Sequence, residues 1–260
     1  MIQAMSSYDD RERLNDYIDV IGVGLQFAFQ PLVHVGTSRI VGYEALVRGR
    51  SGETASSIIA NVRPENLAYF DQACRSRAIQ DASQVGINSD LFLNCTQISP
   101  DNLDLSLNAT REQARACNVR PEQIVLEFAS LVRLGNPRQL AEVRERANAF
   151  GFRVLADNFG TGEAGLKRLV VFQPEFIKLD REIINQVDSS RRKQAMIKGL
   201  VATCRELGTE VIAAGVERAE EVEWLHEHAG VDCFQGYFFA RPQLQAKPSV
   251  SGDRFDLVGS

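Results

Sequence analysis

Short apolar runs alternate with helical patterns along most of the chain. The runs have the length of buried strands, and the segments between them place apolar residues at the three-and-four spacing of amphipathic helices. This alternation is typical of a mostly parallel sheet covered by helices. The expected strands are Leu25–Val33, Ile40–Val47, Leu91–Cys95, Ile124–Phe128, Phe152–Ala156, Phe176–Leu179, Val211–Val216 and Cys233–Phe239. The expected helices are 63–85, 110–118, 136–150, 163–171, 190–207 and 218–229.

The connection between the first two apolar runs is too short for a crossover helix. Only the segment from His34 to Arg39 separates them, which predicts an antiparallel hairpin. The full set of runs therefore predicts an α/β fold, a modified (β/α)8 TIM-like barrel with an antiparallel first strand. We expect the barrel over 25–242, preceded by an extension over 1–24 with an amphipathic helix, and followed by a loosely ordered tail over 243–260.

Composition narrows the classes of partner. The 260 residues, 44% of them hydrophobic, suffice for one barrel. A net charge of −5 gives no long-range attraction for nucleic acid or an anionic membrane. No stretch approaches the ~20 apolar residues of a membrane span. Five cysteines without a CxxC pair indicate free thiols in a reducing compartment. We therefore expect a cytoplasmic protein with a small ligand.

Polar residues end several of the expected strands. In an α/β barrel the chemistry lies where the parallel strands finish, so these positions converge on one axis. A lone strand-end carboxylate usually pairs with a neighbouring arginine or caps a helix, but a ring of them indicates a site. The residues are Glu44, Asn94, Glu127, Asp157, Lys178 and Gln235, with Arg48 and Asp180 just beyond two of the strands.

The chemistry of this set favours a divalent cation. Three carboxylates and an amide oxygen are hard oxygen ligands that repel one another unless Mg²⁺ or Mn²⁺ neutralises them. Such a cation can hold a phosphate and a water, and Lys178 is placed to orient that water or offset charge on a phosphate oxygen. The reaction class that follows is metal-assisted phosphoester hydrolysis.

The chain resembles an EAL domain, the bacterial module that binds and hydrolyses cyclic di-GMP, over about 27–242. The matching motifs are Gln30-Pro31-Leu32-Val33, Glu44-Ala45-Leu46 with Arg48, Leu93-Asn94, Leu126-Glu127, Asp157 followed by Phe159-Gly160-Thr161-Gly162, Ile177-Lys178-Leu179-Asp180, Gly215-Val216-Glu217 and Gln235-Gly236-Tyr237. The resemblance implies that Glu44, Asn94, Glu127 and Asp157 hold a first cation, that Lys178 lies beside the attacking water, and that Gln30, Arg48 and Gln235 contact the dinucleotide. We assign Asp180 to the same ligand-binding set.

The chain departs from the family pattern at residues that serve a second cation. Asn158 stands where the family usually has a second aspartate, and Ala214 stands where it has a glutamate needed for activity. Ser130 replaces a glutamate that steadies a loop, and Glu163 replaces a common tyrosine. Losing one electrostatic element of this kind costs ~3–4 kcal/mol, or roughly 10²–10³ in rate. The sequence therefore predicts one cation site, with the second altered.

Three functions remain open at this point. The first is a cyclic di-GMP receptor with little or no hydrolysis, whose occupancy changes how it contacts a regulatory protein. The second is an active phosphodiesterase that uses Mg²⁺ or Mn²⁺ to give linear pGpG. The third is a protein-interaction module without nucleotide. The sequence also allows a homodimer, to which the helix expected over 8–22 could contribute.

Three other patterns are set aside. Residues Gly160 to Gly165 fit GxGxxG, but Asp157-Asn158-Phe159 intervene between the strand and the first glycine. His226 and His228 are two apart on a helix and face different directions, unlike a zinc-binding pair at four-residue spacing. The basic run 191–193 is typical of a solvent-facing helix start in an acidic protein.

Overall fold

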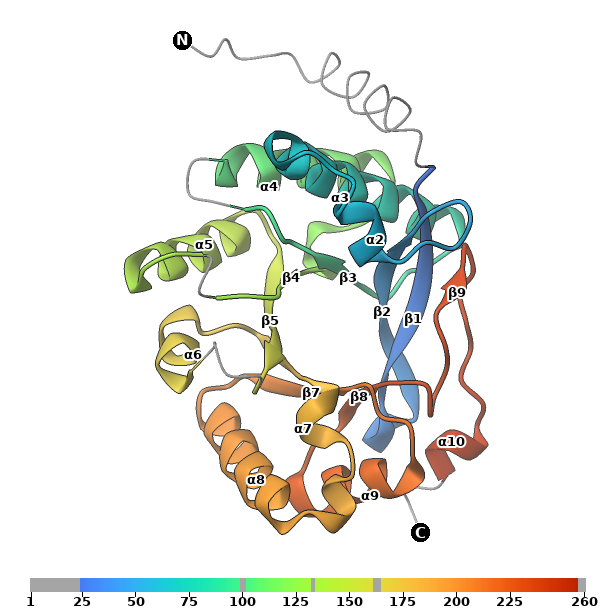
Figure 1. Cartoon of the computed structure of the whole chain (residues 1–260), viewed down its shortest axis with the longest axis vertical. Coiled ribbons are helices and arrows are strands. Elements are labelled where there is room, and N and C mark those ends of the chain that lie inside the picture. Colours follow the sequence, from blue (N-terminus) through green and yellow to red (C-terminus); the bar gives the residue numbers. More distant parts are fainter. Residues whose placement is uncertain (1–23, 99–101, 132–133, 161–164, 257–260) are drawn as a thin grey trace.

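A closed barrel dominates the structure (Figure 1). The computed structural model describes residues 24–98, 102–131, 134–160 and 165–256. Among these residues, nine strands form one sheet in the order β2-β3-β4-β5-β6-β7-β8-β1-β9, and an additional β2–β1 pairing closes it. The strands are β1 (Gln26–His34), β2 (Arg39–Arg48), β3 (Asp90–Asn94), β4 (Ile124–Phe128), β5 (Arg153–Phe159), β6 (Phe176–Leu179), β7 (Glu210–Ala214), β8 (Cys233–Gln235) and β9 (Gln243–Leu244).

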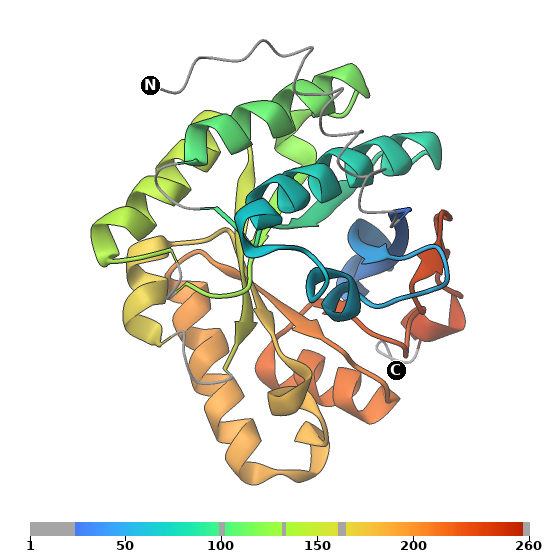
Figure 2. The ribbon, with the colours of Figure 1, turned by 45° about the horizontal axis from the view of Figure 1, so that its top comes forward.

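Helices surround this barrel, and Figure 2 shows α3 and α4 lying side by side on one flank. The α-helices are α2 (Ala55–Ile59), α3 (Leu67–Gln84), α4 (Leu103–Ala116), α5 (Pro137–Ala149), α6 (Leu166–Phe172), α7 (Arg181–Ile184), α8 (Arg191–Glu206), α9 (Ala219–Ala229) and α10 (Asp253–Asp256). The 3-10 helices are η1 (Val35–Thr37), η2 (Pro64–Asn66), η3 (Pro121–Gln123) and η4 (Val187–Ser189). The predicted barrel fold is confirmed.

The first two strands pair antiparallel, as predicted, and β2 to β8 run parallel. The short η1 connection leaves no room for a crossover helix. Because β2 to β8 share one direction, they all finish at the same end of the barrel, which we call the mouth. Their starts, together with the finish of β1, form the opposite end, which we call the base.

The interior of the barrel is layered. Side chains alternate along each strand, so residues two apart share a face. An apolar layer of Leu32, Phe92, Val125, Leu155, Ile212 and Cys233 fills the barrel separately from the larger core beneath the helices. Most of the polar residues predicted for the site lie two positions nearer the mouth than a member of this layer. The apolar layer is thus a dry floor beneath them.

Element boundaries differ from the sequence-based expectation in several places. The expected 110–118 helix begins earlier, as α4 at Leu103, and the last expected strand is only Cys233–Gln235 before a turn. The short helices α2 and α7 were not expected, because few apolar positions define a period in segments of four or five residues. At the mouth, β5 runs three residues further than expected, to Phe159, and β7 ends two residues earlier, at Ala214.

The segment after residue 242 differs from the loosely ordered tail that its polar sequence predicts. In its described part, β9 pairs with β1, and the hydroxyl of Tyr43 donates to the carbonyl of Pro248 at 3.0 Å. Phe255 packs against Phe239. Two backbone pairings and one aromatic side chain attach this segment to the barrel, although its composition shows no period.

Some predictions fall on residues that the structure does not describe. The amphipathic helix expected over 8–22 lies outside the described residues, as does the loop 161–164 with Glu163. The proposed division at residues 24 and 242 stays a prediction. In the described part of the chain, no helix combines the length and hydropathy that a membrane crossing requires.

Candidate active site at the barrel mouth

Glu44 is the centre of the hydrogen-bonded cluster at the mouth. Its Oε2 accepts from Nε2 of Gln235 at 2.7 Å and from Nζ of Lys178 at 3.1 Å, and its Oε1 accepts from Nδ2 of Asn94 at 3.4 Å. Burial would raise the pKa of Glu44, but Lys178 and Gln235 outweigh burial and hold that pKa below its ordinary value. Glu44 is therefore a fixed, ionised carboxylate. The strands β2, β3, β6 and β8 meet around it.

Lys178 joins this carboxylate to a second one. Its Nζ donates to Oε1 of Glu127 at 2.7 Å. Burial would lower the pKa of Lys178, but Glu127 and Glu44 raise it well above its ordinary value, so the ammonium stays charged. A charged lysine cannot act as a base, but it can hold a negative oxygen.

Glu127 carries an unsatisfied oxygen. The residue is fully buried in β4, and its Oε2 has no hydrogen-bond partner among the described residues. Burial, with Glu44 as the next cause, raises the pKa of Glu127 well above its ordinary value. A buried carboxylate oxygen without a partner is costly. The positive charge around Glu127 is therefore too small to offset the cost of ionising this buried carboxylate.

Asp157 adds a third carboxylate to the same cluster. Burial is the largest cause that raises the pKa of Asp157. The positive charge of Lys178 lowers this pKa, and the negative charge of Glu44 raises it further. When all three carboxylates are ionised, one ammonium against three negative charges leaves a net charge of minus two. This deficit, the unpartnered Oε2 of Glu127 and the hard oxygen donors fit one divalent cation. We call Glu44, Asn94, Glu127 and Asp157 the ligand-rich side of the mouth.

Two further positions at the mouth, Asn158 of β5 and Ala214 of β7, flank β6, and we call this pair the altered side. Asn158 lies where the β5–β6 pairing shifts register, with a φ of 53°. Asparagine and aspartate both tolerate this left-handed backbone, so the amide preserves the bulge while removing a charge. Ala214 ends β7 on the interior face, and its methyl group offers no ligand atom. The altered side therefore carries no side-chain charge at either position and no side-chain ligand atom at Ala214.

The backbone behind Ala214 is firmly held. The carbonyl of Gln235 accepts from the amides of Gly215 at 2.7 Å and Val216 at 3.1 Å. At Gly236 a Cβ would lie 2.0 Å from the carbonyl oxygen of Val216, so no larger residue fits this approach. The Gln235-Gly236 motif thus has a geometric reason, because it brings Gln235 beside Glu44.

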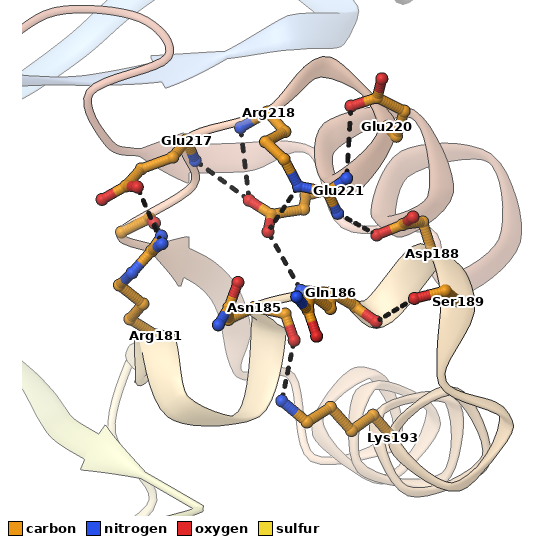
Figure 3. A network of polar contacts seen from close by, with 11 residues as sticks. Arg181, Asn185, Gln186, Asp188, Ser189, Lys193, Glu217, Arg218, Glu220 and Glu221 are labelled. Carbon is orange, nitrogen blue, oxygen red and sulfur yellow. Dashed lines mark hydrogen bonds and ion pairs between the residues drawn. The ribbon is translucent and has the colours of Figure 1, made fainter.

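A polar network extends this support to the segment after β7 (Figure 3). Glu221 is fully buried, and its carboxylate accepts from the backbone amides of Glu217 at 3.0 Å, Arg218 at 3.3 Å and Gln186 at 3.1 Å. Arg181 also donates to Glu217 at 2.8 Å and to the carbonyl of Gly215. Sequence analysis missed Glu221. Glu221 is the third residue of α9, a position at which a glutamate often caps the helix start. The usual capping pattern also has a serine or threonine at the N-cap, where this chain has Arg218.

The three remaining predicted ligand-binding residues make hydrogen bonds to backbone groups. Gln30 faces Glu44 across the β1–β2 pair, and its Nε2 donates to the carbonyl of Ala240 at 3.1 Å. Arg48 ends β2 and donates to the carbonyl of Val47 at 2.8 Å. Asp180 caps α7 by accepting from the amide of Glu182 at 2.7 Å. A nucleotide-binding role for these three residues stays a prediction.

A buried ion pair behind Asn94 was also missed. Arg75 and Asp71 of α3 form an ion pair, and Oδ1 of Asp71 accepts from the amide and the hydroxyl of Thr96 at 3.0 and 2.6 Å. This pair fixes the chain immediately after the end of β3. An aspartate and an arginine four residues apart on a helix usually form a solvent-exposed pair. The burial of Asp71 and Arg75 therefore becomes visible only from the tertiary structure.

The fold and this mouth define a class of protein, and the chain belongs to the EAL domain family, whose model matches residues 16–242. Among curated proteins, it is 33% identical over 231 residues to the blue light- and temperature-regulated antirepressor BluF of Escherichia coli K12, covering 86% of this chain and 56% of that protein. It is 26% identical to the probable cyclic di-GMP phosphodiesterase PdeN of the same strain, covering 83% of this chain and 43% of that protein. The chain thus spans about half the length of these curated relatives.

Solved structures agree with the fold. A standalone versatile EAL protein from Vibrio cholerae O395, in a c-di-GMP bound form, aligns with a TM-score of 0.83 at 34% identity, covering 89% of this chain and 98% of that one. A manganese and cy-diGMP complex of Klebsiella pneumoniae BlrP1 aligns with a TM-score of 0.75 at 31% identity, covering 85% of this chain and 56% of that one. The similarity covers most of the described chain.

Proposed function

We propose that this EAL domain binds cyclic di-GMP together with one divalent cation, hydrolyses it little or not at all, and acts as a regulatory receptor. The observation that carries the proposal is the contrast within the mouth. Four ligand residues and Lys178 are gathered on one side, while Asn158 and Ala214 leave the other without charge. Relatives whose names describe a cyclic di-GMP phosphodiesterase and a c-di-GMP bound form support the ligand. The antirepressor named among the relatives supports a regulatory role.

The cation is assigned to Glu44, Asn94, Glu127 and Asp157. A bound Mg²⁺ or Mn²⁺ would neutralise these carboxylates and supply Lewis-acid polarisation of a phosphate group. Calcium and manganese complexes of a solved relative support a divalent ion. The chain's own contribution is to orient these oxygens, because Gln235 and Lys178 fix Glu44, and Lys178 also fixes Glu127.

Binding of the nucleotide is assigned to polar groups around that cation. Gln30, Arg48, Asp180 and Gln235 are the proposed contacts, and the permanent charge of Lys178 suits a phosphate oxygen. Efficient hydrolysis requires cations ~3.5–4 Å apart that clamp the attacking and leaving oxygens. Asn158 and Ala214 remove two groups of the second cation, so we expect the bound ester to stay intact.

The alternative is a weak Mg²⁺- or Mn²⁺-dependent phosphodiesterase that releases linear pGpG. One observation favours it, namely that the charged Lys178 remains beside Glu44 and Glu127, where it could orient a water. We propose that the protein works in the cytoplasm, because its five cysteines are free thiols. A regulatory protein partner and a homodimer belong to the same proposal.

A binding titration tests the receptor function. Cyclic di-GMP is titrated into the purified protein in EDTA, in Mg²⁺ and in Mn²⁺, and the nucleotide is chromatographed afterwards. We expect tighter binding with either cation and recovery of the cyclic form. Recovery of pGpG at many turnovers would establish the phosphodiesterase instead. Absence of binding under all three conditions would leave a nucleotide-independent interaction module.

A further inference from the structure

The base of the barrel holds a second cluster of ligand-type side chains, outside the mouth. His34 ends β1, Glu210 begins β7 and Cys233 begins β8. The β1–β8 register places His34 opposite Cys233, and the β7–β8 register places Ile212 opposite Cys233. Glu210 lies two residues before Ile212 and therefore shares its face. All three residues point into the base of the barrel.

The ligand atoms of these residues are already close together. One atom from each of His34, Glu210 and Cys233 lies within 4.8 Å of the other two. The thiol of Cys233 donates to Oε1 of Glu210 at 2.7 Å. Ligands around a tetrahedral zinc ion lie roughly 3–4 Å apart, given bonds of ~2.0–2.3 Å. The exposed side chain of Glu210 can rotate to reduce the separation of the ligand atoms from 4.8 Å to this spacing.

An unsatisfied nitrogen provides a second, independent observation. Nδ1 of His34 is buried and has no hydrogen-bond partner among the described residues. A buried polar atom without a partner costs ~1–3 kcal/mol, and a cation would remove that cost. The nearby Asp232 carboxylate is engaged by Nδ1 of His226 at 3.0 Å, so we do not count it as a ligand.

The donor set distinguishes this cluster from the mouth. Thiolate, imidazole and carboxylate together suit Zn²⁺, whereas the oxygen donors of the mouth suit Mg²⁺ or Mn²⁺. Three protein ligands leave a fourth position for water. Glu210 is exposed, which gives an ion a path from solvent, while Cys233 is buried on the inner side.

We propose that His34, Glu210 and Cys233 form a binding site for Zn²⁺ at the base of the barrel, separate from the nucleotide site and independent of the function proposed for it. Binding replaces the thiol proton of Cys233, which leaves to solvent, by the metal–sulfur bond. The described β1–β8 seam consists of two residue pairs, Val33 with Phe234 and His34 with Cys233. A metal that joins β1, β7 and β8 would therefore strengthen the place where the barrel closes.

Cobalt provides a probe that reads the sulfur ligand directly. Co²⁺ is titrated into the reduced full-length protein, and the near-ultraviolet thiolate-to-Co²⁺ charge-transfer band is recorded. We expect one equivalent of Co²⁺ to produce the band, Zn²⁺ to abolish it by displacement, and Zn²⁺ to raise the unfolding temperature. The ligands assigned at the mouth are carboxylate and amide side chains, so Co²⁺ bound to them gives no such band.

Matched variants locate the band. Cys233→Ser removes it, while Cys117→Ser, at a thiol contacted by Gln113 instead, retains it. Asp157→Asn at the mouth also retains it. Because a serine inside the barrel can impair folding, Glu210→Gln at an exposed side chain is the second variant, with circular dichroism as the folding check. We expect it to weaken Co²⁺ affinity at least ~10-fold.

Two results would overturn the proposal. The first is saturation of the wild-type protein with Co²⁺ or Zn²⁺ without a thiolate band or a thermal shift. The second is a band that persists in folded Cys233→Ser, or a Co²⁺ affinity that is unchanged in folded Glu210→Gln. Either result would assign the Cys233–Glu210 contact to an ordinary buried hydrogen bond.

Discussion

The ligand-rich side and the altered side of the barrel mouth share one backbone framework and differ in charge. On the ligand-rich side, Glu44 and Glu127 are joined by Lys178, and the carboxylates exceed the cationic charge around them. On the altered side, Asn158 lies in a β-bulge and Ala214 ends β7 without a polar atom. The strand ends are formed on both sides, so the uncharged residues at 158 and 214 are compatible with the barrel fold.

This difference shows that scaffold and reactivity are separable in the mouth. The segment after Ala214 is held by three hydrogen bonds from backbone amides to Glu221, although Ala214 itself has no polar side chain. This combination of a supported backbone and two uncharged positions underlies the receptor function proposed above.

Restoring charge to the altered side has the largest expected effect. The double change Asn158→Asp with Ala214→Glu should raise the rate of cyclic di-GMP hydrolysis at least ~10-fold, because one electrostatic element of this kind is worth up to roughly 10²–10³ in rate. Product formation is measured by chromatography in Mn²⁺. The same double change with Lys178→Met is the control and should stay inactive. An unchanged rate in the double variant would show that the defect lies elsewhere.

Removing charge from the ligand-rich side should weaken cation-dependent binding. Glu44→Gln keeps the shape of the side chain and removes one ionised ligand, so Mn²⁺-dependent affinity for cyclic di-GMP should fall at least ~10-fold. Calorimetric titration in Mn²⁺ and in EDTA measures the effect. Glu145→Gln, at an exposed position of α5, should leave the affinity unaltered. Equal loss of affinity in Mn²⁺ and EDTA would contradict a cation role for Glu44.

The support behind the altered side can be tested through stability. Glu221→Ala removes an acceptor for three backbone amides and should lower the free energy of unfolding by roughly 1–3 kcal/mol. Urea unfolding followed by circular dichroism measures it. The neighbouring Glu220→Ala, at an exposed side chain, should change stability by at most ~0.5 kcal/mol. Equal effects of the two changes would mean that the network does not hold this segment.

The smallest effect is a pH trend on the ligand-rich side. In the folded protein the pKa of Glu127 is raised above its ordinary value of 4.5. The stability that Glu127 contributes is therefore fully present below pH 4.5, where the side chain is protonated, and it is lost as the pH rises through the raised pKa. In EDTA, Glu127→Gln should therefore gain stability relative to wild type as the pH rises above 4.5. Urea unfolding across this range measures the difference, and Glu145→Gln is the control. A difference that does not change with pH would contradict the raised pKa.

Sequence alone predicted the barrel and the strand ends because both follow from simple periodicity. Apolar runs that contain Glu44, Glu127 or Lys178 read directly as strands with one polar position, and barrel closure then brings those residues together. The hairpin followed from the length of one connection. The family resemblance added roles that spacing could not supply.

The features that sequence missed depend on tertiary contacts. Asp71 and Arg75 resemble an ordinary exposed helical pair, yet both are buried behind β3. The carboxylate of Glu221 is recognised as a backbone support only when α9 lies beside η4. The base cluster draws His34, Glu210 and Cys233 from three strands, and no local motif connects them.

The most direct test of the central claim examines nucleotide that the protein carries. The protein is incubated with cyclic di-GMP and Mg²⁺, separated by rapid gel filtration, and the nucleotide in the protein and free fractions is identified by chromatography. We expect near-stoichiometric, intact cyclic di-GMP in the protein fraction and no linear pGpG in either fraction. Abundant pGpG, or a protein fraction without nucleotide, would contradict it.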